Sequence, residues 1–149
     1  MGNLPNDHFV ERCVLTSPSR PLPLLSQEAL PFWEGCLKDQ LLLQHCCDCG
    51  AINWLPKSFC ARCSSDRLTW KEASGDGVLE SFSIVYRPMN EAWASQVPYI
   101  LALVWLKEGI RMVTRLEMEK GRIPTIDGPV RVYFVDIGDG FKAPFWRPQ

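Results

Sequence analysis

Alternating apolar and polar residues predict short β-strands in the second half of the chain. Phe82, Ile84 and Tyr86 would share one face of a strand, while Ser81 and Ser83 share the other. This two-residue period is typical of a strand with one buried face. Glycine, proline and aspartate residues divide the later sequence into further segments of strand length. The expected strands are 78–87, 99–107, 110–118, 130–136 and 141–146.

The segment 100–106 is apolar on both faces, which suits a strand in the middle of a sheet. Lys107, Glu108 and Gly109 would then make a tight link to the next strand. Five strands of this length favour a small closed barrel of the OB-fold type, and an open β-sandwich is the alternative. The chain is therefore expected to be mainly β.

A short helix is predicted ahead of these strands, over 27–40. Ser26 is a candidate N-cap for it. Phe32 and Cys36 lie four residues apart, so they would share one side of the helix. Gly35 weakens the prediction, because glycine is a poor helix former.

Four cysteines form two Cys-x-x-Cys pairs, Cys46 with Cys49 and Cys60 with Cys63, ten residues apart. Two intervening residues let both thiolates of one turn reach an ion at about 2.3 Å, and a second turn completes the tetrahedron that Zn²⁺ prefers. Gly50 would let the backbone turn sharply beside the metal. Four thiolates leave no coordination position for water, so the site is expected to be structural.

Other interpretations of the cysteines stay open. Iron in a rubredoxin-like site is the rival metal. His45 and Cys47 adjoin the first pair and are alternative ligands, although neighbours on a turn point in different directions. Buried or redox-paired cysteines are a third interpretation, but paired spacing in a chain with seven cysteines favours metal. Cys13 and Cys36 are expected to be small buried apolar side chains.

These patterns divide the chain into four parts. Prolines at positions 5, 18, 21 and 23 disfavour regular structure near the N-terminus. The expected parts are an extended Pro-rich arm over 1–25, the helix with a lead-in strand at 41–44 over 26–44, a zinc ribbon over 45–72 and an OB-fold over 73–149.

Charge and hydropathy narrow the function. The 16 Lys and Arg residues nearly balance the 17 Asp and Glu residues, so the basic field of a phosphate-backbone binder is absent and nucleic acid is disfavoured as a partner. The longest apolar run, 99–106, is much shorter than the roughly 20 residues of a membrane span. The protein is expected to be cytoplasmic, without membrane association.

No motif of an independent active site stands out. His8 and His45 are the only histidines, and neither adjoins a candidate cysteine nucleophile outside the metal site. A glycine-rich phosphate loop, a serine elbow and paired catalytic carboxylates are all missing from the sequence. Trp54, Phe59 and Trp70 flank the cysteines, where they would either stack on bases or adenine or form the core of the ribbon.

The whole arrangement resembles the zinc-ribbon OB-fold proteins that accompany thiolases and related acyl-CoA enzymes. The likeness covers about 31–149. Besides the four cysteines and Trp70, its carriers are the segments 31–35, 74–77, 81–83, 86–88, 98–99, 136–140 and 144–148.

The resemblance implies an N-terminal helix, a rubredoxin-like zinc ribbon and an OB-fold in a subunit without catalytic groups of its own. Such a subunit docks on a thiolase, a thiolase-like aldolase or an acyl-CoA synthase. The chain is thus expected in a hetero-oligomer, for which α2β2 is one candidate, that cleaves a 3-oxoacyl-CoA with coenzyme A. There it would help to form or cover the entrance for coenzyme A or acyl-CoA.

Candidate contacts to the ligand or the partner are residues that offer cations to phosphates or aromatic faces to adenine. They are Lys57, Arg62, Tyr86, Arg87 and Tyr99. The alternative function is a nucleic-acid-binding module, because zinc ribbons and OB-folds both occur in that class. A third is a carrier that binds acyl-CoA without a partner.

Overall fold

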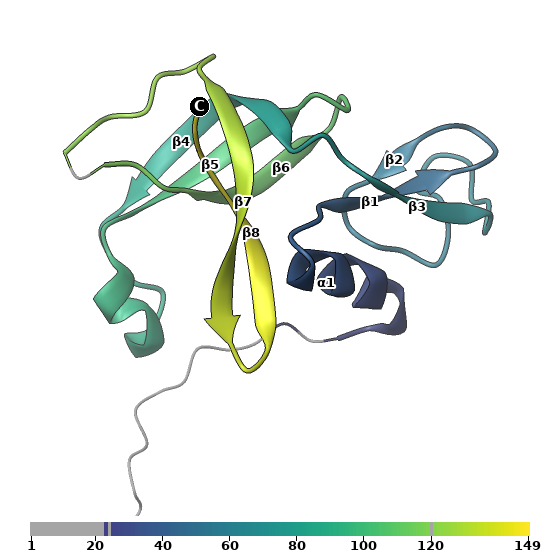
Figure 1. Ribbon diagram of the computed structural model, residues 1–149, viewed down its shortest axis with the longest axis horizontal. Coiled ribbons are helices and arrows are strands. Elements are labelled where there is room, and N and C mark those ends of the chain that lie inside the picture. Colours follow the sequence, from purple (N-terminus) through teal and green to yellow (C-terminus); the bar gives the residue numbers. More distant parts are fainter. Residues whose placement is uncertain (1–22, 24, 120) are drawn as a thin grey trace, which may run out of the picture.

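The computed structural model describes residue 23 and residues 25–119 and 121–149 of the protein. The expected arm over 1–25 therefore lies almost entirely outside the described residues. The described chain forms a three-stranded sheet and a closed five-stranded barrel, with one α-helix beside both (Figure 1). No helix in this part of the chain is long and apolar enough to cross a membrane.

The helix is shorter than predicted. A 3-10 turn, η1, covers Gln27–Ala29, and the α-helix, α1, covers Leu30–Leu37. Ser26 occupies the N-cap position of this turn with an extended backbone, as predicted, but its side chain makes no capping hydrogen bond. Phe32 and Cys36 are buried together, as their spacing predicted.

Gly35 permits a close approach between α1 and the strand that follows. A Cβ atom at this position would lie 2.7 Å from Cγ of Leu42 and 3.0 Å from the carbonyl oxygen of Gln40. The chain reverses directly after the helix, where Asp39 has a φ of 60°. The weak helix former is thus the residue that lets helix and strand touch.

The ribbon sheet has β1 (Leu42–Cys46) at its centre, between β2 (Ile52–Asn53) and β3 (Leu68–Glu72). Both neighbours run antiparallel to β1. Only a lead-in strand at 41–44 was predicted here. The two outer strands escaped prediction because β2 is two residues long and β3 shows no alternation of buried and exposed positions.

The barrel closes in the order β4-β5-β6-β8-β7, with β7 pairing back onto β4. Each strand begins and ends within two residues of its predicted range, and the closed barrel rules out the open sandwich. The strands are β4 (Asp76–Val85), β5 (Tyr99–Leu106), β6 (Arg111–Leu116), β7 (Pro129–Gly138) and β8 (Phe141–Pro148). A second 3-10 helix, η2 (Glu91–Gln96), projects from the connection between β4 and β5 (Figure 1).

Two details of the strand prediction change. Tyr86 was expected on the buried face with Phe82 and Ile84, but β4 ends at Val85 and the Tyr86 side chain is 69% exposed. The strand β5 buries only one of its two apolar faces, that of Ala102, Val104 and Leu106, against the barrel interior. Its other face lies on the outside of the barrel.

One core joins the helix, the sheet and the barrel. Phe32 and Cys36 of α1 belong to the same buried cluster as Leu43 of β1 and Trp146 of β8. On the outer side, Trp33 of α1 meets Phe141 edge to face at 5.7 Å. The ribbon is therefore attached to the barrel through α1 as well as through the connecting chain.

Candidate metal centre

Each cysteine pair sits on a tight turn closed by its own backbone. Cys46 is the last residue of β1, and its carbonyl oxygen accepts a hydrogen bond from the N–H of Gly50 at 3.0 Å. The carbonyl oxygen of Cys60 accepts one from the N–H of Ser64 at 2.9 Å. The residue after each pair has a left-handed backbone, with φ of 69° at Gly50 and 58° at Ser64. Glycine suits this conformation, and the second turn forms with serine instead.

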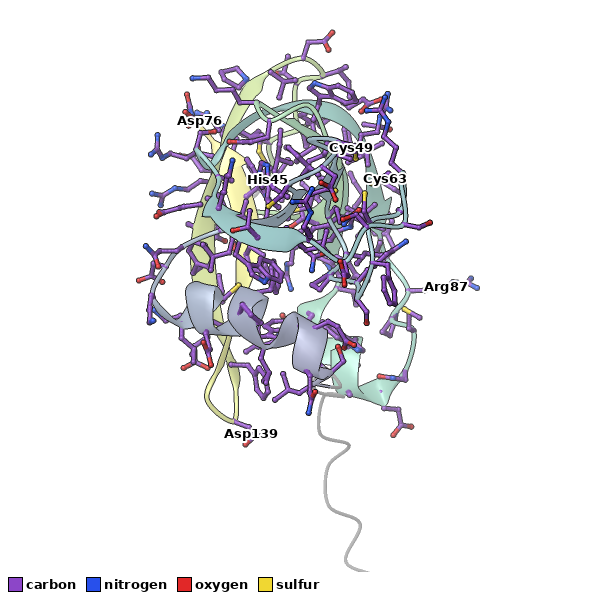
Figure 2. The ribbon with its side chains drawn as sticks, turned by 90° about the vertical axis from the view of Figure 1, so that its right-hand side faces the viewer. His45, Cys49, Cys63, Asp76, Arg87 and Asp139 are labelled. Carbon is purple, nitrogen blue, oxygen red and sulfur yellow. The ribbon has the colours of Figure 1, made fainter. Side chains whose placement is uncertain are left out.

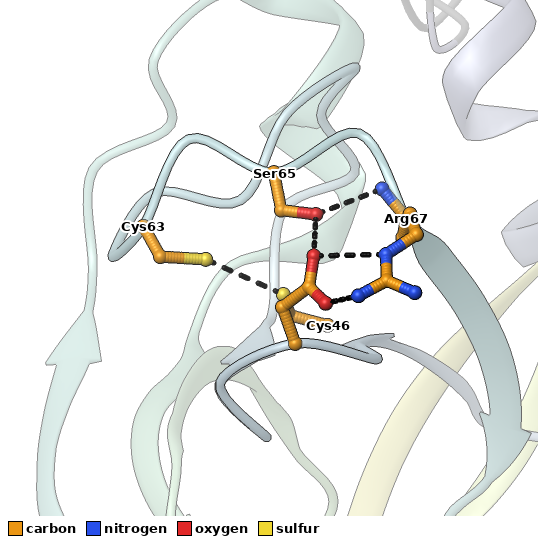
Figure 3. A network of polar contacts seen from close by, with 5 residues as sticks. Cys46, Cys63, Ser65 and Arg67 are labelled. Carbon is orange, nitrogen blue, oxygen red and sulfur yellow. Dashed lines mark hydrogen bonds and ion pairs between the residues drawn. The ribbon is translucent and has the colours of Figure 1, made fainter.

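The two turns bring the four sulfur atoms together. All four Sγ atoms lie within 4.8 Å of one another. The sulfurs of Cys46 and Cys63 are 3.5 Å apart (Figure 3), and those of Cys49 and Cys60 are 3.6 Å apart. Four sulfurs at about 2.3 Å from a central Zn²⁺ ion would be separated by roughly 3.8 Å. The cluster thus has the donor set and nearly the spacing of a structural zinc site.

The pKa shifts of three of these thiols indicate how a bound cation would change their ionisation. The pKa of Cys46 falls to about 7, chiefly because the backbone N–H of Cys49 donates a hydrogen bond to it. The pKa of Cys60 is lowered by the N–H of Arg62. The N–H of Ser65 lowers the pKa of Cys63, but the neighbouring Cys49 and Cys46 outweigh this effect and raise it to about 12. Without a cation, the ionised thiols oppose further ionisation; a divalent ion would remove that opposition.

A polar network ties the two turns together outside the sulfur cluster. The Arg67 side chain forms an ion pair with Asp48, and its Nε donates to Oδ2 of that carboxylate at 3.0 Å. Ser65 donates its hydroxyl to the same carboxylate and accepts the N–H of Arg67 at 3.0 Å (Figure 3). Asp48 comes from the first turn, whereas Ser65 and Arg67 follow the second. The network therefore holds the turns in register.

A second network, missed from the sequence, lies beneath the site. Gln44 and Asn53 are buried polar residues on the neighbouring strands β1 and β2. The Gln44 amide donates to the carbonyl oxygen of Lys57 at 2.9 Å, and its oxygen accepts from Asn53 and from the N–H of Lys57, both at 3.2 Å. Asn53 in turn accepts the N–H of Ala61 at 3.4 Å. The only sequence signal was two amides among apolar residues close to the cysteines.

The alternative ligands lie outside the cluster. Among the described residues, the group that could hold a metal consists of the four paired cysteines and includes neither His45 nor Cys47. Figure 2 places His45 apart from Cys49 and Cys63. Burial and then the nearby charge of Lys71 lower the pKa of His45, which favours its neutral form. Cys47 is exposed.

The aromatic residues near the cysteines serve mainly as ribbon core. Trp54 and Trp70 are partly buried against the main core, and Trp54 meets Phe32 of α1 edge to face at 6.1 Å. Phe59 alone is largely exposed, at 59%. Cys36 is buried as expected, and burial raises its pKa to about 12. Cys13 lies outside the described residues.

The five candidate contact residues fall into two groups. Lys57 and Arg62 are exposed on the loops of the ribbon. Tyr86 and Arg87 are exposed just after β4, and Arg87 projects away from the molecule in Figure 2. Tyr99 begins β5 opposite Val85, and its half-buried ring lies beneath the guanidinium of Arg115 at 5.3 Å.

Two family models match adjoining parts of the chain. The rubredoxin-like zinc ribbon domain of ChsH2 matches residues 33–69, and the C-terminal OB-fold domain of ChsH2 matches residues 70–135. The first match contains all four paired cysteines, which supports a structural Zn²⁺ ion. The second contains most of the barrel.

Curated relatives include subunits of hydratases and a scaffold protein. A probable enoyl-CoA hydratase alpha subunit from Thermomonospora curvata is 29% identical over 87% of this chain. The 3-oxo-4,17-pregnadiene-20-carboxyl-CoA hydratase alpha subunit of Mycobacterium tuberculosis is 29% identical over 85% of it. A DUF35 domain-containing scaffold protein from Methanothermobacter thermautotrophicus is 29% identical over 48%. The chain spans only 40% of the length of each hydratase subunit and 53% of the scaffold protein.

Solved structures show the same architecture. A chain of the Ltp2-ChsH2(DUF35) aldolase superimposes with a TM-score of 0.76 at 28% identity, over 85% of this chain and 98% of that one. A DUF35-family protein of unknown function from Sulfolobus solfataricus superimposes with a TM-score of 0.57 at 15% identity, over 83% and 87% of the two chains, and shows the fold alone. The chain therefore carries, in succession, segments that match the rubredoxin-like zinc ribbon domain and the C-terminal OB-fold domain of ChsH2.

Proposed function

We propose that the protein is an accessory subunit of an acyl-CoA-processing complex and that its catalytic partner is a thiolase-type enzyme acting on a 3-oxoacyl-CoA with coenzyme A. The observation that carries this proposal is the match to almost the whole length of one chain of the Ltp2-ChsH2(DUF35) aldolase. Two relatives named as alpha subunits of CoA-thioester hydratases support the acyl-CoA substrate class.

The chemistry of the chain suits an accessory role. Cys46, Cys49, Cys60 and Cys63 would hold one Zn²⁺ ion and saturate its four positions, so that the ion stabilises the ribbon and activates no water. The partner would then supply the nucleophile and the acid–base groups. On this proposal, the exposed side chains of Lys57, Arg62 and Arg87 offer cations to the phosphates of coenzyme A. Tyr86 and Tyr99 offer aromatic faces near the same entrance.

The direct test is purification of the complex from the native host through a tag on this chain. A thiolase-type subunit should copurify in fixed stoichiometry, and the complex should cleave a 3-oxoacyl-CoA with coenzyme A while neither subunit does so alone. One family member of similar size and layout belongs to a 2-benzoylsuccinyl-CoA thiolase, so 2-benzoylsuccinyl-CoA belongs among the substrates assayed. Copurification with a hydratase or an aldolase alone would retain the accessory role and contradict the thiolase reaction.

Two controls separate the remaining alternatives. Titration of the isolated chain with acyl-CoA should show little binding, because the entrance needs both subunits; tight binding would favour a carrier. Tight and salt-sensitive binding of single-stranded DNA or RNA would favour the nucleic-acid module instead.

A further inference from the structure

An apolar groove lies where the helix, the ribbon and the barrel meet. Its volume is about 430 Å³, within the range of specific binding sites. One wall is α1, a second is the loop after β2, and the floor is formed by β6 and β8. The side chains that define it are Phe32, Trp33, Trp54, Leu55, Val113 and Phe145.

The groove exists because two barrel strands diverge. The parallel strands β6 and β8 pair only at Leu116 and Trp146. Further along, the gap is bridged by a side chain, since the hydroxyl of Thr114 donates to the carbonyl oxygen of Pro144 at 3.0 Å. The groove is therefore a built feature of the barrel wall.

Exposed apolar side chains lie on both sides of the groove. Leu55 on the ribbon side is 60% exposed, and Val113 on the barrel side is 57% exposed. Leu101 lies next to the groove residue Arg115 on the paired strand β5 and is 42% exposed. An exposed apolar surface of this kind is typical of a protein interface.

Arg115 gives the groove a positive charge without a counter-charge. Its guanidinium stacks between the rings of Tyr99 and Phe145, at 5.3 and 5.5 Å, and its Nη1 donates to the side-chain oxygen of Gln96 at 2.9 Å. No acidic residue lines the groove, and within the described part of the chain Arg115 makes no ion pair. By contrast, Arg111 on the same strand is paired with Glu80.

An arginine held in this way is prepared for a carboxylate. Stacking and the bond to Gln96 fix the plane of the guanidinium and use one of its five N–H donors. The others remain for a second group, and a carboxylate can accept two parallel, charge-assisted hydrogen bonds from such a fork. Charge complementarity therefore selects an occupant with an apolar side chain beside a negative charge.

We propose that this groove docks a segment of the catalytic partner in which an apolar side chain lies next to an Asp or Glu, with Arg115 binding the carboxylate. The identity of the partner rests on the function proposed above. The apolar side chain enters between Trp33 and Val113, and the docked segment covers the carboxylate and Arg115, so that their charge pair is buried.

Photo-crosslinking in the assembled complex tests the occupant. Val113→p-benzoylphenylalanine places the crosslinker in the groove, and Ile123→p-benzoylphenylalanine, at a 73% exposed position between β6 and β7, is the control. The Val113 crosslink should capture a peptide of the catalytic subunit with an acidic residue within three positions of an apolar one. Capture of a second copy of this chain, of a peptide without an acidic residue or of nothing in an intact complex overturns the proposal.

Affinity measurements test the role of Arg115 in binding the catalytic subunit. Arg115→Gln should weaken binding to the catalytic subunit by about 30-fold or more, as expected when one partner of a buried charge pair is lost. Arg115→Lys should bind with an affinity between those of the unmodified chain and Arg115→Gln, because lysine keeps the positive charge but loses the planar guanidinium fork. Arg122→Gln is the matched control, since Arg122 pairs with Glu119 in an exposed loop, and it should leave binding unchanged.

The two proposals fail in different ways. If the unmodified chain forms no complex with a thiolase-type subunit, the proposed function fails. If it forms that complex and Arg115→Gln binds equally well, only the groove proposal fails. Zinc content and thermal unfolding of each variant show whether a loss of binding comes from loss of the fold.

Discussion

The thiols of Cys46, Cys60 and Cys63 differ in how readily they ionise. Backbone N–H groups of the two turns lower the pKa of Cys46 to about 7 and also lower that of Cys60. Cys63 carries the opposite shift, to about 12, because its neighbours Cys49 and Cys46 outweigh the N–H of Ser65. A metal ion bound here would thus meet some thiolates already formed and others still protonated.

This difference predicts the proton release that accompanies zinc binding. At about pH 8 Cys46 is already a thiolate, whereas Cys63 must lose its proton to bind the metal. Zinc binding should release at least one proton but fewer than four, and affinity should fall as the pH is lowered through 7, because protons then compete for Cys46. Calorimetry in buffers of different ionisation enthalpy measures the number. Release of four protons at this pH would contradict the assignment.

The buried amide of Gln44 should matter more than its polar character suggests. Gln44→Ala leaves the backbone N–H and C=O of Lys57 and the amide of Asn53 without their partner, so we expect a loss of about 1–3 kcal/mol in unfolding free energy. Urea denaturation measures it. Gln40→Ala is the control: Gln40 makes an exposed bond to Glu72, and its removal should have a much smaller effect. If Gln44→Ala and Gln40→Ala lowered the unfolding free energy equally, burial of the Gln44 network would contribute nothing to stability.

Between elements, the decisive contact is that of α1 with β1. The helix and the strand are in close contact at Gly35, where there is no room for a Cβ atom beside Leu42. Lys38 and Gln40 both donate their N–H groups to the carbonyl oxygen of Gly35, so the turn that follows is built on the same residue. The position needs the absence of a side chain, not a left-handed backbone.

Gly35→Ala should therefore destabilise the protein, although alanine is the better helix former. The added methyl group overlaps the Leu42 side chain, and overpacking of this kind costs about 1–3 kcal/mol, more than the roughly 1 kcal/mol gained from helix propensity. Thermal and urea unfolding measure the balance. Glu34→Ala, at an exposed position of the same helix, should be neutral or slightly stabilising. A more stable Gly35→Ala protein would contradict the close approach.

The sequence predicted those elements whose pattern is repeated over several residues. Alternation from Phe82 to Ile84 and the apolar run 99–106 located strands to within two residues, because one face of each is buried in the barrel. Local patterns could not reveal β2 and β3, since their pairing depends on the cysteine turns between them. The same limit hid the Gln44–Asn53 contact and the groove, which arise only when distant segments meet.

For the cysteines, sequence reasoning went further than for any other part of the site. The spacing of the two pairs encodes two identical turns, and the structure brings their sulfurs together. The five candidate contacts to coenzyme A had no such spacing behind them, and the structure separates them into two groups. Their role remains a prediction.

At the scale of the molecule, ribbon and barrel share one core. Leu43 of the ribbon strand β1 is as deeply buried as Leu79 and Trp146 of the barrel, and all three belong to the same buried cluster as Phe32 and Cys36 of α1. Loss of the metal site should therefore lower the stability of the barrel.

Cys60→Ser tests this coupling. The variant should lose zinc affinity by more than the roughly 10–100-fold typical of changes outside the ligand set, and the unfolding midpoint of the barrel should fall with it. Hydrogen exchange of the backbone amides of β5 and β8 reports on the barrel, and a colorimetric assay reports on zinc. Cys47→Ser, beside the cluster but outside it, should retain both. A barrel signal unchanged in Cys60→Ser would show that the two parts unfold independently.

The shared core also limits how the protein can be divided. Two family models meet at residues 69 and 70, which suggests two exchangeable modules. Yet a fragment that starts after the ribbon would leave behind Phe32, Cys36 and Leu43, and with them one wall of its own interior. A chimera of two relatives should therefore fold only if α1 and the barrel come from the same protein. The segment that can be exchanged between relatives is larger than either domain alone.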